Sequence, residues 1–432
     1  MALSRRVLPI ALVLAFQQAL AAISTAWRSQ VFDPDVFWVA AAGRDMLATH
    51  DVPRTNLWSF VDGAHPWTMH EWLFGPPYAL GLRAFGPAFF LGVGIVFGIV
   101  IGLLVTGAFL ADVRSNAVAL GAALAVLFIC DPRIGLARPT YAALVFPLAL
   151  AILAFRPRFG NAHAAGAIAI AWVWANAHGS FPLGWIVLAA AFAETPNRPH
   201  AIAVVGAVLA SFVNPYGLGL HRLVVDYALG RGSAAEAHAH VYEYAPIWRS
   251  EYHEVTPPLL LAASIACGLG AALLLARRRH VARAGLVLLF AIAGLLAARH
   301  VVLAPLVGTV VLAPAIDERI TKADAVVRPL RLAVAVFAPA LVLGLALLAI
   351  RAARTAPEDL LSPKLGGADV VALVHDVPDD TRVYTPFRSA SLVIWEGAPR
   401  GIRIFYDSRN DCYSPEVARW QFAHNDEHAI AE

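Results

Sequence analysis

The sequence predicts an all-α polytopic membrane domain followed by a small C-terminal α/β tail. Of its 432 residues, 59% are hydrophobic and only 15% are charged, and the mean hydropathy is +0.65. Ordinary soluble domains carry about a quarter charged residues, so this composition could not cover a water-exposed surface of such a size. The apolar residues also fall in long uninterrupted runs, as a bilayer requires.

Net charge and cysteine content give no support to several other classes of protein. The formal net charge of +3 gives no reason to expect a nucleic-acid partner. Cys130, Cys267 and Cys412 are far apart and odd in number, so these cysteines support neither a disulfide framework nor a zinc site.

About eleven transmembrane helices are expected within residues 1–350, the predicted membrane domain. Several of the apolar runs are short for a hydrocarbon core of about 30 Å and would need flanking residues to cross it. The first run also resembles a secretory signal, but a retained helix is favoured because many further spans follow it. The predicted spans are 7–24, 87–111, 117–130, 140–155, 163–177, 180–193, 200–213, 257–276, 284–298, 301–316 and 330–350.

The distribution of basic residues predicts the orientation of these spans. A cytoplasmic N-terminus places most loop arginines and lysines on the cytoplasmic side of a bacterial inner membrane, and leaves few basic residues in the short external turns. Three longer regions are then external: residues 25–86, residues 214–256 and the tail, 351–432. We expect the functional site where these three regions converge.

Two carboxylates follow the first predicted span directly. Asp33 and Asp35 flank Pro34, and the pattern from Asp35 to about Leu47 predicts a helix lying on the membrane surface. Sugar transfer needs a base that deprotonates the acceptor hydroxyl, so both are candidate catalytic residues. The alternative is that Asp33 caps the helix and Asp35 stabilises its positive end. Four tryptophans are expected at the membrane interface: Trp38, Trp58, Trp67 and Trp72.

A second helix, interfacial or re-entrant, is predicted over residues 71–86. His70 and Glu71 stand at its start, where they could cap it or contact substrate. Neither role is favoured by the sequence.

Cationic and polar residues at the external ends of spans are candidates for binding a phosphate group. Arg138 precedes one span, His178 ends another, and Arg299 with His300 forms almost a whole turn. Arginine offers a planar fork that matches phosphate oxygens. The alternatives are snorkelling of Arg138 and Arg299 to lipid headgroups, and a capping or hydrogen-bonding role for His178.

The external loop 214–256 is rich in histidine, carboxylate and aromatic residues. Its histidines could bind a divalent metal, but their spacing matches no firm metal signature, so no metal ligand is assigned. Its aromatic rings could stack on sugars or rest on lipid. The polar residues are Glu236, His238, His240, Glu243, Glu251, His253 and Glu254, and the aromatic ones are Tyr242, Tyr244, Trp248 and Tyr252.

The sequence pattern of the tail predicts a βαβ unit. After a linker we expect helices near residues 368–375, 389–395 and 415–422, and strands near 382–387 and 402–406. Two strands make a sheet that is marginal by itself, so the tail either packs on the membrane domain or lacks strands. Asp407 and Arg409 follow the second strand, where they could contact a ligand or form a buried structural pair.

The order of motifs resembles bacterial membrane proteins of the GT-C glycosyltransferase superfamily, related to the protein mannosyltransferases and the aminoarabinose transferase of lipid A. The resemblance covers nearly the whole chain and implies a GT-C-like fold and an acidic catalytic residue that maps onto Asp35 or Asp33. Asn56 departs from it, since an Asp is more usual there, and the implied tail is longer. The matching residues are Asp33-Pro34-Asp35 with Trp38, Gly43-Arg44, Pro53, Asn56, Ser59-Phe60, Trp67, His70-Glu71-Trp72-Leu73, Trp174 to Gly179, Asn214 to Gly217, Arg299-His300 and Asp407-Ser408-Arg409.

The resemblance implies transfer of a sugar from a polyprenyl-phosphate carrier to a glycan, lipid or protein acceptor on the external face. Asp35, aided or replaced by Asp33, would be the base. Three alternatives remain open: an O-antigen polymerase or ligase, a secondary transporter, and a relative that has lost catalysis. The sequence shows no internal repeat and no acidic residue in mid-span, which disfavours a transporter.

Overall fold

The computed structural model describes residues 35–112, 123, 125–127, 130, 138–249, 258–316, 367–387 and 389–423. Within these ranges the protein is mainly helical, as predicted. Asp33, the predicted spans 7–24 and 330–350, and most of 117–130 lie outside them.

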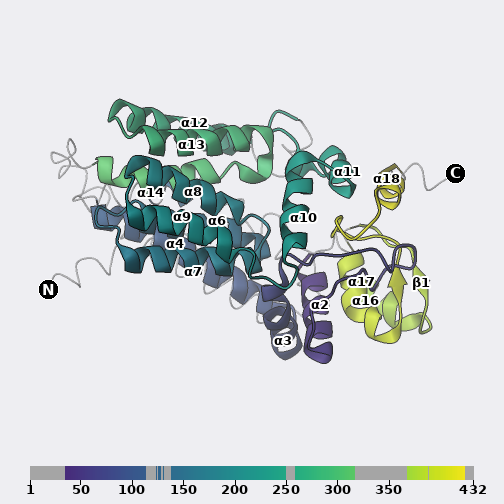
Figure 1. The fold of residues 1–432 in the computed structure, drawn as a ribbon. Coiled ribbons are helices and arrows are strands. Elements are labelled where there is room, and N and C mark those ends of the chain that lie inside the picture. The colour runs from purple at the N-terminus through teal and green to yellow at the C-terminus, as the bar shows by residue number, and fades with distance from the viewer. Residues whose placement is uncertain are drawn as a thin grey trace, which may run out of the picture.

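A bundle of apolar helices forms the larger part of the molecule (Figure 1). Its core is almost entirely Ala, Val, Leu and Phe, contributed by every helix of the bundle, and includes the fully buried Trp174 and Tyr141. The helices are α4 (Ala88–Asp112), η2 (Pro139–Tyr141), α6 (Ala142–Ala154), α7 (Asn161–Ala177), α8 (Pro182–Glu194), α9 (Arg198–Ala210), α12 (Pro258–Arg277), α13 (Val281–Leu296), η5 (Ala298–His300) and α14 (Leu303–Ile316).

These helices lie where the sequence predicts spans, within a few residues at each end, but the expected number of eleven transmembrane helices is not supported. Among the helices of the described residues, only α4 and α12 are both long and apolar enough to cross a membrane. α8 and α9 have 13 residues each, which is about 20 Å of helix against a hydrocarbon core of about 30 Å.

The bundle exposes many large apolar side chains. They come from several helices, and each helix is apolar on most of its circumference. Soluble proteins rarely expose large contiguous apolar patches. The exposed residues include Ile95, Val96, Trp172, Phe192, Ile202, Val205, Leu209, Leu259, Leu273, Leu288 and Ile292.

A second hydrophobic core joins the first predicted external loop to the C-terminal tail. Figure 1 shows α2 beside α17, although they come from opposite ends of the chain. The elements of this unit are α2 (Asp35–Thr49), η1 (Trp72–Phe74), α3 (Gly75–Phe85), α16 (Gly367–Asp376), β1 (Arg382–Val383), α17 (Ala390–Gly397), η8 (Ala398–Arg400), β2 (Arg403–Ile404) and α18 (Pro415–Ala423).

The predicted βαβ unit is confirmed, and the first loop completes its thin sheet. β1 and β2 pair in parallel, with Arg382 opposite Arg403. Along the other edge of β2, Ile404 N–H donates to Trp58 C=O at 2.9 Å, and Phe60 N–H donates to Ile404 C=O at 3.0 Å. The tail therefore forms one packed unit with the loop, and its sheet gains a third extended segment.

The expectation that α2 lies on the membrane surface is wrong. Residues from Val36 to Gly43 are all buried, because α3 packs on one side of the helix and α17 on another. Gly43 permits the α2–α3 contact: a Cβ atom there would lie 1.9 Å from the carbonyl oxygen of Gly75.

Three of the tryptophans expected at the membrane interface also lie in this core. Trp38, Trp58 and Trp67 are 3–5% exposed, and edge-on ring contacts of 5.7–5.9 Å link them. Trp72 is only partly buried and donates from Nε1 to Asn176 on α7 at 3.2 Å. The rings of Trp38, Trp58 and Trp67 therefore pack between the first loop and the tail. The sequence alone could not distinguish this burial from contact with lipid.

Candidate functional site

Arg138 joins the first and second predicted external loops. Its two terminal nitrogens contact different carboxylates, with Nη2 3.0 Å from Asp35 Oδ2 and Nη1 2.8 Å from Glu243 Oε1. Asp35 opens α2, Glu243 lies in η3 (Tyr242–Tyr244) of the second loop, and Arg138 precedes η2 of the bundle. The other carboxylate oxygen of Asp35 accepts a short hydrogen bond from the hydroxyl of Ser408 in the tail. First loop, second loop and tail thus converge on one network, as expected.

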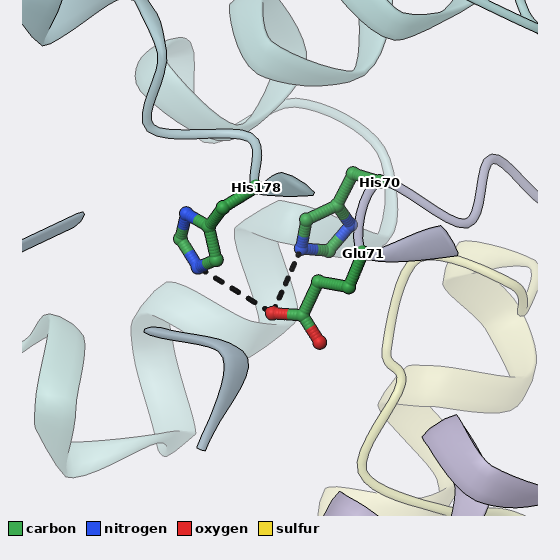
Figure 2. A group of neighbouring side chains, drawn as sticks. All are labelled: His70, Glu71 and His178. Carbon is green, nitrogen blue, oxygen red and sulfur yellow. Dashed lines mark ion pairs between the residues drawn. The ribbon is translucent and has the colours of Figure 1, made fainter. Parts of the chain in front are cut away.

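Beside this network, two histidines converge on one carboxylate oxygen. Glu71 Oε1 lies 3.6 Å from His70 Nε2 and 3.4 Å from His178 Nε2. Figure 2 shows both imidazole rings turning a nitrogen toward that oxygen, while the second oxygen of Glu71 points away. The two rings meet edge to face, with centroids 5.6 Å apart. The loop before η1 supplies His70 and Glu71, and the end of α7 supplies His178.

Burial changes the protonation of this group. It raises the pKa of Glu71 to about 8, an effect increased by the charge of Asp35 and opposed by Arg138 and Arg299. Burial, with the charge of Arg299, lowers the pKa of His70 to about 4. The pKa of His178 is also lowered, by burial and then by His70. At neutral pH the carboxyl group therefore holds its proton and both histidines are neutral, so the group can take part in acid–base chemistry.

Local contacts orient His178 and leave room for His70. His178 Nδ1 lies 2.8 Å from the hydroxyl oxygen of Ser180. The backbone N–H of Ser180 also donates to this nitrogen, at 3.1 Å. Gly179 leaves room for the His70 ring, because a Cβ atom at that position would lie 3.3 Å from His70 Cδ2.

Arg299 and His300 occupy η5 between α13 and α14. The guanidinium of Arg299 lies 4.6 Å from the ring centroid of Tyr244, and its charge acts on Glu71, His70 and His178. His300 also lowers the pKa of His178. The structure therefore places the predicted turn beside the cluster, and the ring of Tyr244 supports the arginine.

Asp407 and Arg409, proposed above as substrate-binding residues, form a buried pair in the second core. Both side chains are 0% exposed, and Arg409 Nη2 lies 2.6 Å from Asp407 Oδ2. The guanidinium is also 4.5 Å from the ring centroid of Trp58 and 4.6 Å from that of Trp67. A role in contacting substrate is thus disfavoured, and the structural alternative is supported.

Asn56 forms a hydrogen bond with the same buried pair. Its side-chain oxygen accepts from Arg409 Nη2 at 2.8 Å, and its amide donates to the Cys412 carbonyl at 3.2 Å. Asn56, which departs from the pattern of the resembled group, therefore lies buried in this unit.

Seven of the ten predicted site residues lie together: Asp35, His70, Glu71, Arg138, His178, Arg299 and His300. Of the other three, Asp407 and Arg409 are in the core, and Asp33 lies outside the described residues. The sequence did not single out Ser408 or Glu243 as partners of the network. Ser408 lies inside the Asp407-Ser408-Arg409 motif, and this position is the sequence feature that could have identified it as a site residue.

The metal considered for the second loop finds no support in the part of that loop which the structure describes. His238 stacks on Tyr244, with ring centroids 4.7 Å apart, and Glu243 pairs with Arg138. Exposed His240 lies 3.8 Å from Glu236. Glu251, His253 and Glu254 lie outside the described residues.

No protein-family model matches this chain, and no curated protein matches it significantly.

Proposed function

We propose that this protein is a multi-span inner-membrane glycosyltransferase that moves a sugar from a polyprenyl-phosphate carrier to an acceptor on the external face. The observation that supports it most is the network around Asp35. A carboxylate, a guanidinium group and a hydroxyl meet there, beside a second carboxyl group with a raised pKa.

Exposed apolar surface and the placement of charge support a membrane location. The large apolar side chains that the bundle exposes suit contact with lipid, and the short helices would cross with the help of flanking residues. The candidate site gathers where α7 and α13 end and η2 and α14 begin. A different set of charges, His280 2.6 Å from Glu194 and Arg283 3.4 Å from it, joins the end of α8 to the start of α13. Charged groups thus lie at both ends of α13, with an apolar stretch between them, which suits a membrane-spanning helix.

In the proposed reaction Asp35 is the base. It takes the proton from an acceptor hydroxyl, whose oxygen then bonds to the anomeric carbon of the donor sugar. The bond from that carbon to the phosphate oxygen breaks, and the phosphate keeps the electron pair. The hydroxyl of Ser408 already donates to Asp35 Oδ1, so that oxygen accepts a hydroxyl hydrogen in this arrangement. An acceptor hydroxyl would replace Ser408 there.

Arg138 and Arg299 would stabilise the departing phosphate. Arginine presents several N–H donors in a fixed plane, which suits the charge that develops on phosphate oxygens. Arg138 also holds Asp35 at 3.0 Å, so the same side chain would position the base and neutralise the leaving group.

The decisive experiment compares Asp35→Asn with wild type in a transfer assay with polyprenyl-phosphate sugars and purified protein. The amide keeps the shape of the side chain but cannot accept a proton, so transfer should fall by about 10²- to 10⁴-fold while folding is retained. Glu236→Gln is the matched control, because Glu236 pairs with Arg419 and His240 away from the site. Transfer that survives in Asp35→Asn would reject the proposal.

Two further measurements address the competing functions. Mass spectrometry of the product separates the addition of one sugar from the joining of whole glycan chains. Counterflow of labelled solute in proteoliposomes that is insensitive to Asp35→Asn would favour a transporter.

A further inference from the structure

The group formed by His70, Glu71 and His178 has the composition of a metal site. One ligand atom from each residue lies within 4.8 Å of the other two, and no other such group occurs among the described residues. Two imidazoles and one carboxylate are ligands that Zn²⁺ binds, whereas Mg²⁺ and Ca²⁺ favour oxygen ligands throughout.

The spacing of the ligand atoms separates a metal site from a hydrogen-bonded group. A hydrogen bond between nitrogen and oxygen spans about 2.7–3.2 Å. Two ligands at about 2.0–2.1 Å from a tetrahedral ion are about 3.3–3.4 Å apart. Glu71 Oε1 lies 3.4 Å from His178 Nε2 and 3.6 Å from His70 Nε2, so both distances are close to the ligand separation of a tetrahedral site.

Contacts outside the group orient one of the ligands, His178. Histidines that bind metals usually direct the other ring nitrogen to a hydrogen-bond partner, which fixes ring and tautomer. His178 Nδ1 lies 2.8 Å from the Ser180 hydroxyl and accepts from the Ser180 backbone N–H at 3.1 Å. Binding a metal through Nε2 therefore moves the ring proton to Nδ1, where it is donated to the Ser180 hydroxyl oxygen and replaces the backbone bond. Both Nε2 atoms face the same carboxylate oxygen (Figure 2).

The charges around the group determine which fourth ligand it favours. Asp35 and Glu243 balance Arg138 and Arg299, so the group is neutral while Glu71 holds its proton. A divalent cation that displaces this proton leaves one net positive charge, which favours an anionic fourth ligand.

We propose that His70, Glu71 and His178 bind one Zn²⁺ ion through His70 Nε2, Glu71 Oε1 and His178 Nε2, with the fourth position open to water or an anion. Three protein ligands with one open position are typical of zinc sites that take part in chemistry. The site stands on its own geometry, whether or not the protein transfers sugars.

Zinc binding to the full-length protein, purified in detergent and stripped with a chelator, tests the proposal. Equilibrium dialysis against zinc alone, read by elemental analysis, should give about one bound ion per chain in wild type. His178→Gln and Glu71→Gln should each weaken binding at least about tenfold. His240→Gln is the matched control, because His240 also lies beside a glutamate but outside the group, and it should bind as wild type does.

X-ray absorption of the zinc-loaded wild type identifies the ligands without any substitution, so the proposal stays testable if a variant fails to fold. Two imidazoles with oxygen and no sulfur support the site. Zinc bound at well under one ion per chain, binding unchanged in both folded ligand variants, or sulfur among the ligands would overturn it. None of these readouts depends on transferase activity, so failure of the metal site is distinguishable from failure of the proposed function.

Discussion

Ser408 in the tail donates a hydrogen bond to Asp35 across 373 positions of sequence. The acid at the start of α2 is therefore covered by the tail, while Arg138 holds it from the bundle side. The tail and first loop share one core, so the position of Asp35 depends on both chain segments being folded together.

Replacing Arg138 should test this arrangement directly. Arg138→Ala leaves Asp35 and Glu243 facing each other without their shared cation, and we expect transfer to fall by about 10²-fold or more. Arg138→Lys keeps the charge but cannot contact both carboxylates in one plane, so an intermediate loss of about tenfold is expected. The measurement is kcat/KM with a polyprenyl-phosphate sugar. Equal activity in the two variants would show that the geometry of the fork is irrelevant.

The buried Asp407–Arg409 pair should control the stability of the loop–tail unit. Asp407→Asn leaves a guanidinium without its full counter-charge at a 0% exposed position, and we expect a loss of about 3–5 kcal/mol in the free energy of unfolding. Thermal unfolding followed by intrinsic tryptophan fluorescence suits the measurement, because Trp58 and Trp67 contact this pair.

A double variant, Asp407→Leu with Arg409→Met, provides the control for that prediction. It removes both charges together, so it should recover a large part of the lost stability. If the single and double variants were equally unstable, the pair would contribute to the free energy of unfolding through packing and not through charge compensation.

Helix positions could be predicted from this sequence, while the partners of each helix could not. The apolar runs at 87–111 and 257–276 correspond to α4 and α12 within one residue at each end. The same pattern of apolar residues led to the wrong prediction that α2 lies on a membrane surface. Apolar residues predict burial, but they do not identify the segment or lipid that buries them. The cover is α3 and α17, and α17 lies some 350 residues away in sequence.

The candidate site was predictable to a similar degree. The expectation that the three predicted external regions converge depended only on topology. Arg138 joins two of them through Asp35 and Glu243, and Ser408 joins the tail to Asp35. Polarity alone could not separate buried structural pairs from site residues. Asp407 and Arg409 are as polar as Glu71 and His178, and the difference between them arises from packing between distant segments.

The close approach of α2 and α3 provides a stability test away from charge. Gly43→Ala would place a Cβ atom 1.9 Å from the Gly75 carbonyl oxygen, so the helices must separate and the second core must loosen. We expect a fall of about 1–3 kcal/mol in the free energy of unfolding. Gly270→Ala in α12 is the matched control, because a Cβ atom there meets nothing within 4 Å and alanine favours the helix. Both can be measured by thermal unfolding in detergent.

Asp411 should make the stability of the loop–tail unit depend on pH. Burial raises the pKa of its carboxyl group to about 8, opposed by Arg409 and reinforced by Asp407, and its buried Oδ2 has no hydrogen-bond partner among the described residues. The folded state keeps this proton up to about pH 8, whereas the unfolded chain loses it near the ordinary value of 3.8. Unfolding therefore releases a proton between these limits, so rising pH destabilises the folded state, by at most about 1.4 kcal/mol per pH unit.

Asp411→Asn removes this dependence, because an amide does not ionise. The thermal midpoint of the variant should exceed that of wild type by a margin that grows from pH 5 to pH 8 and is constant above about pH 8. Asp62→Asn is a useful comparison, since Asp62 accepts a hydrogen bond from Ser414 in the same unit and its loss should lower stability. A margin for Asp411→Asn that stayed flat across this range would mean that the carboxyl group is already ionised in the folded protein.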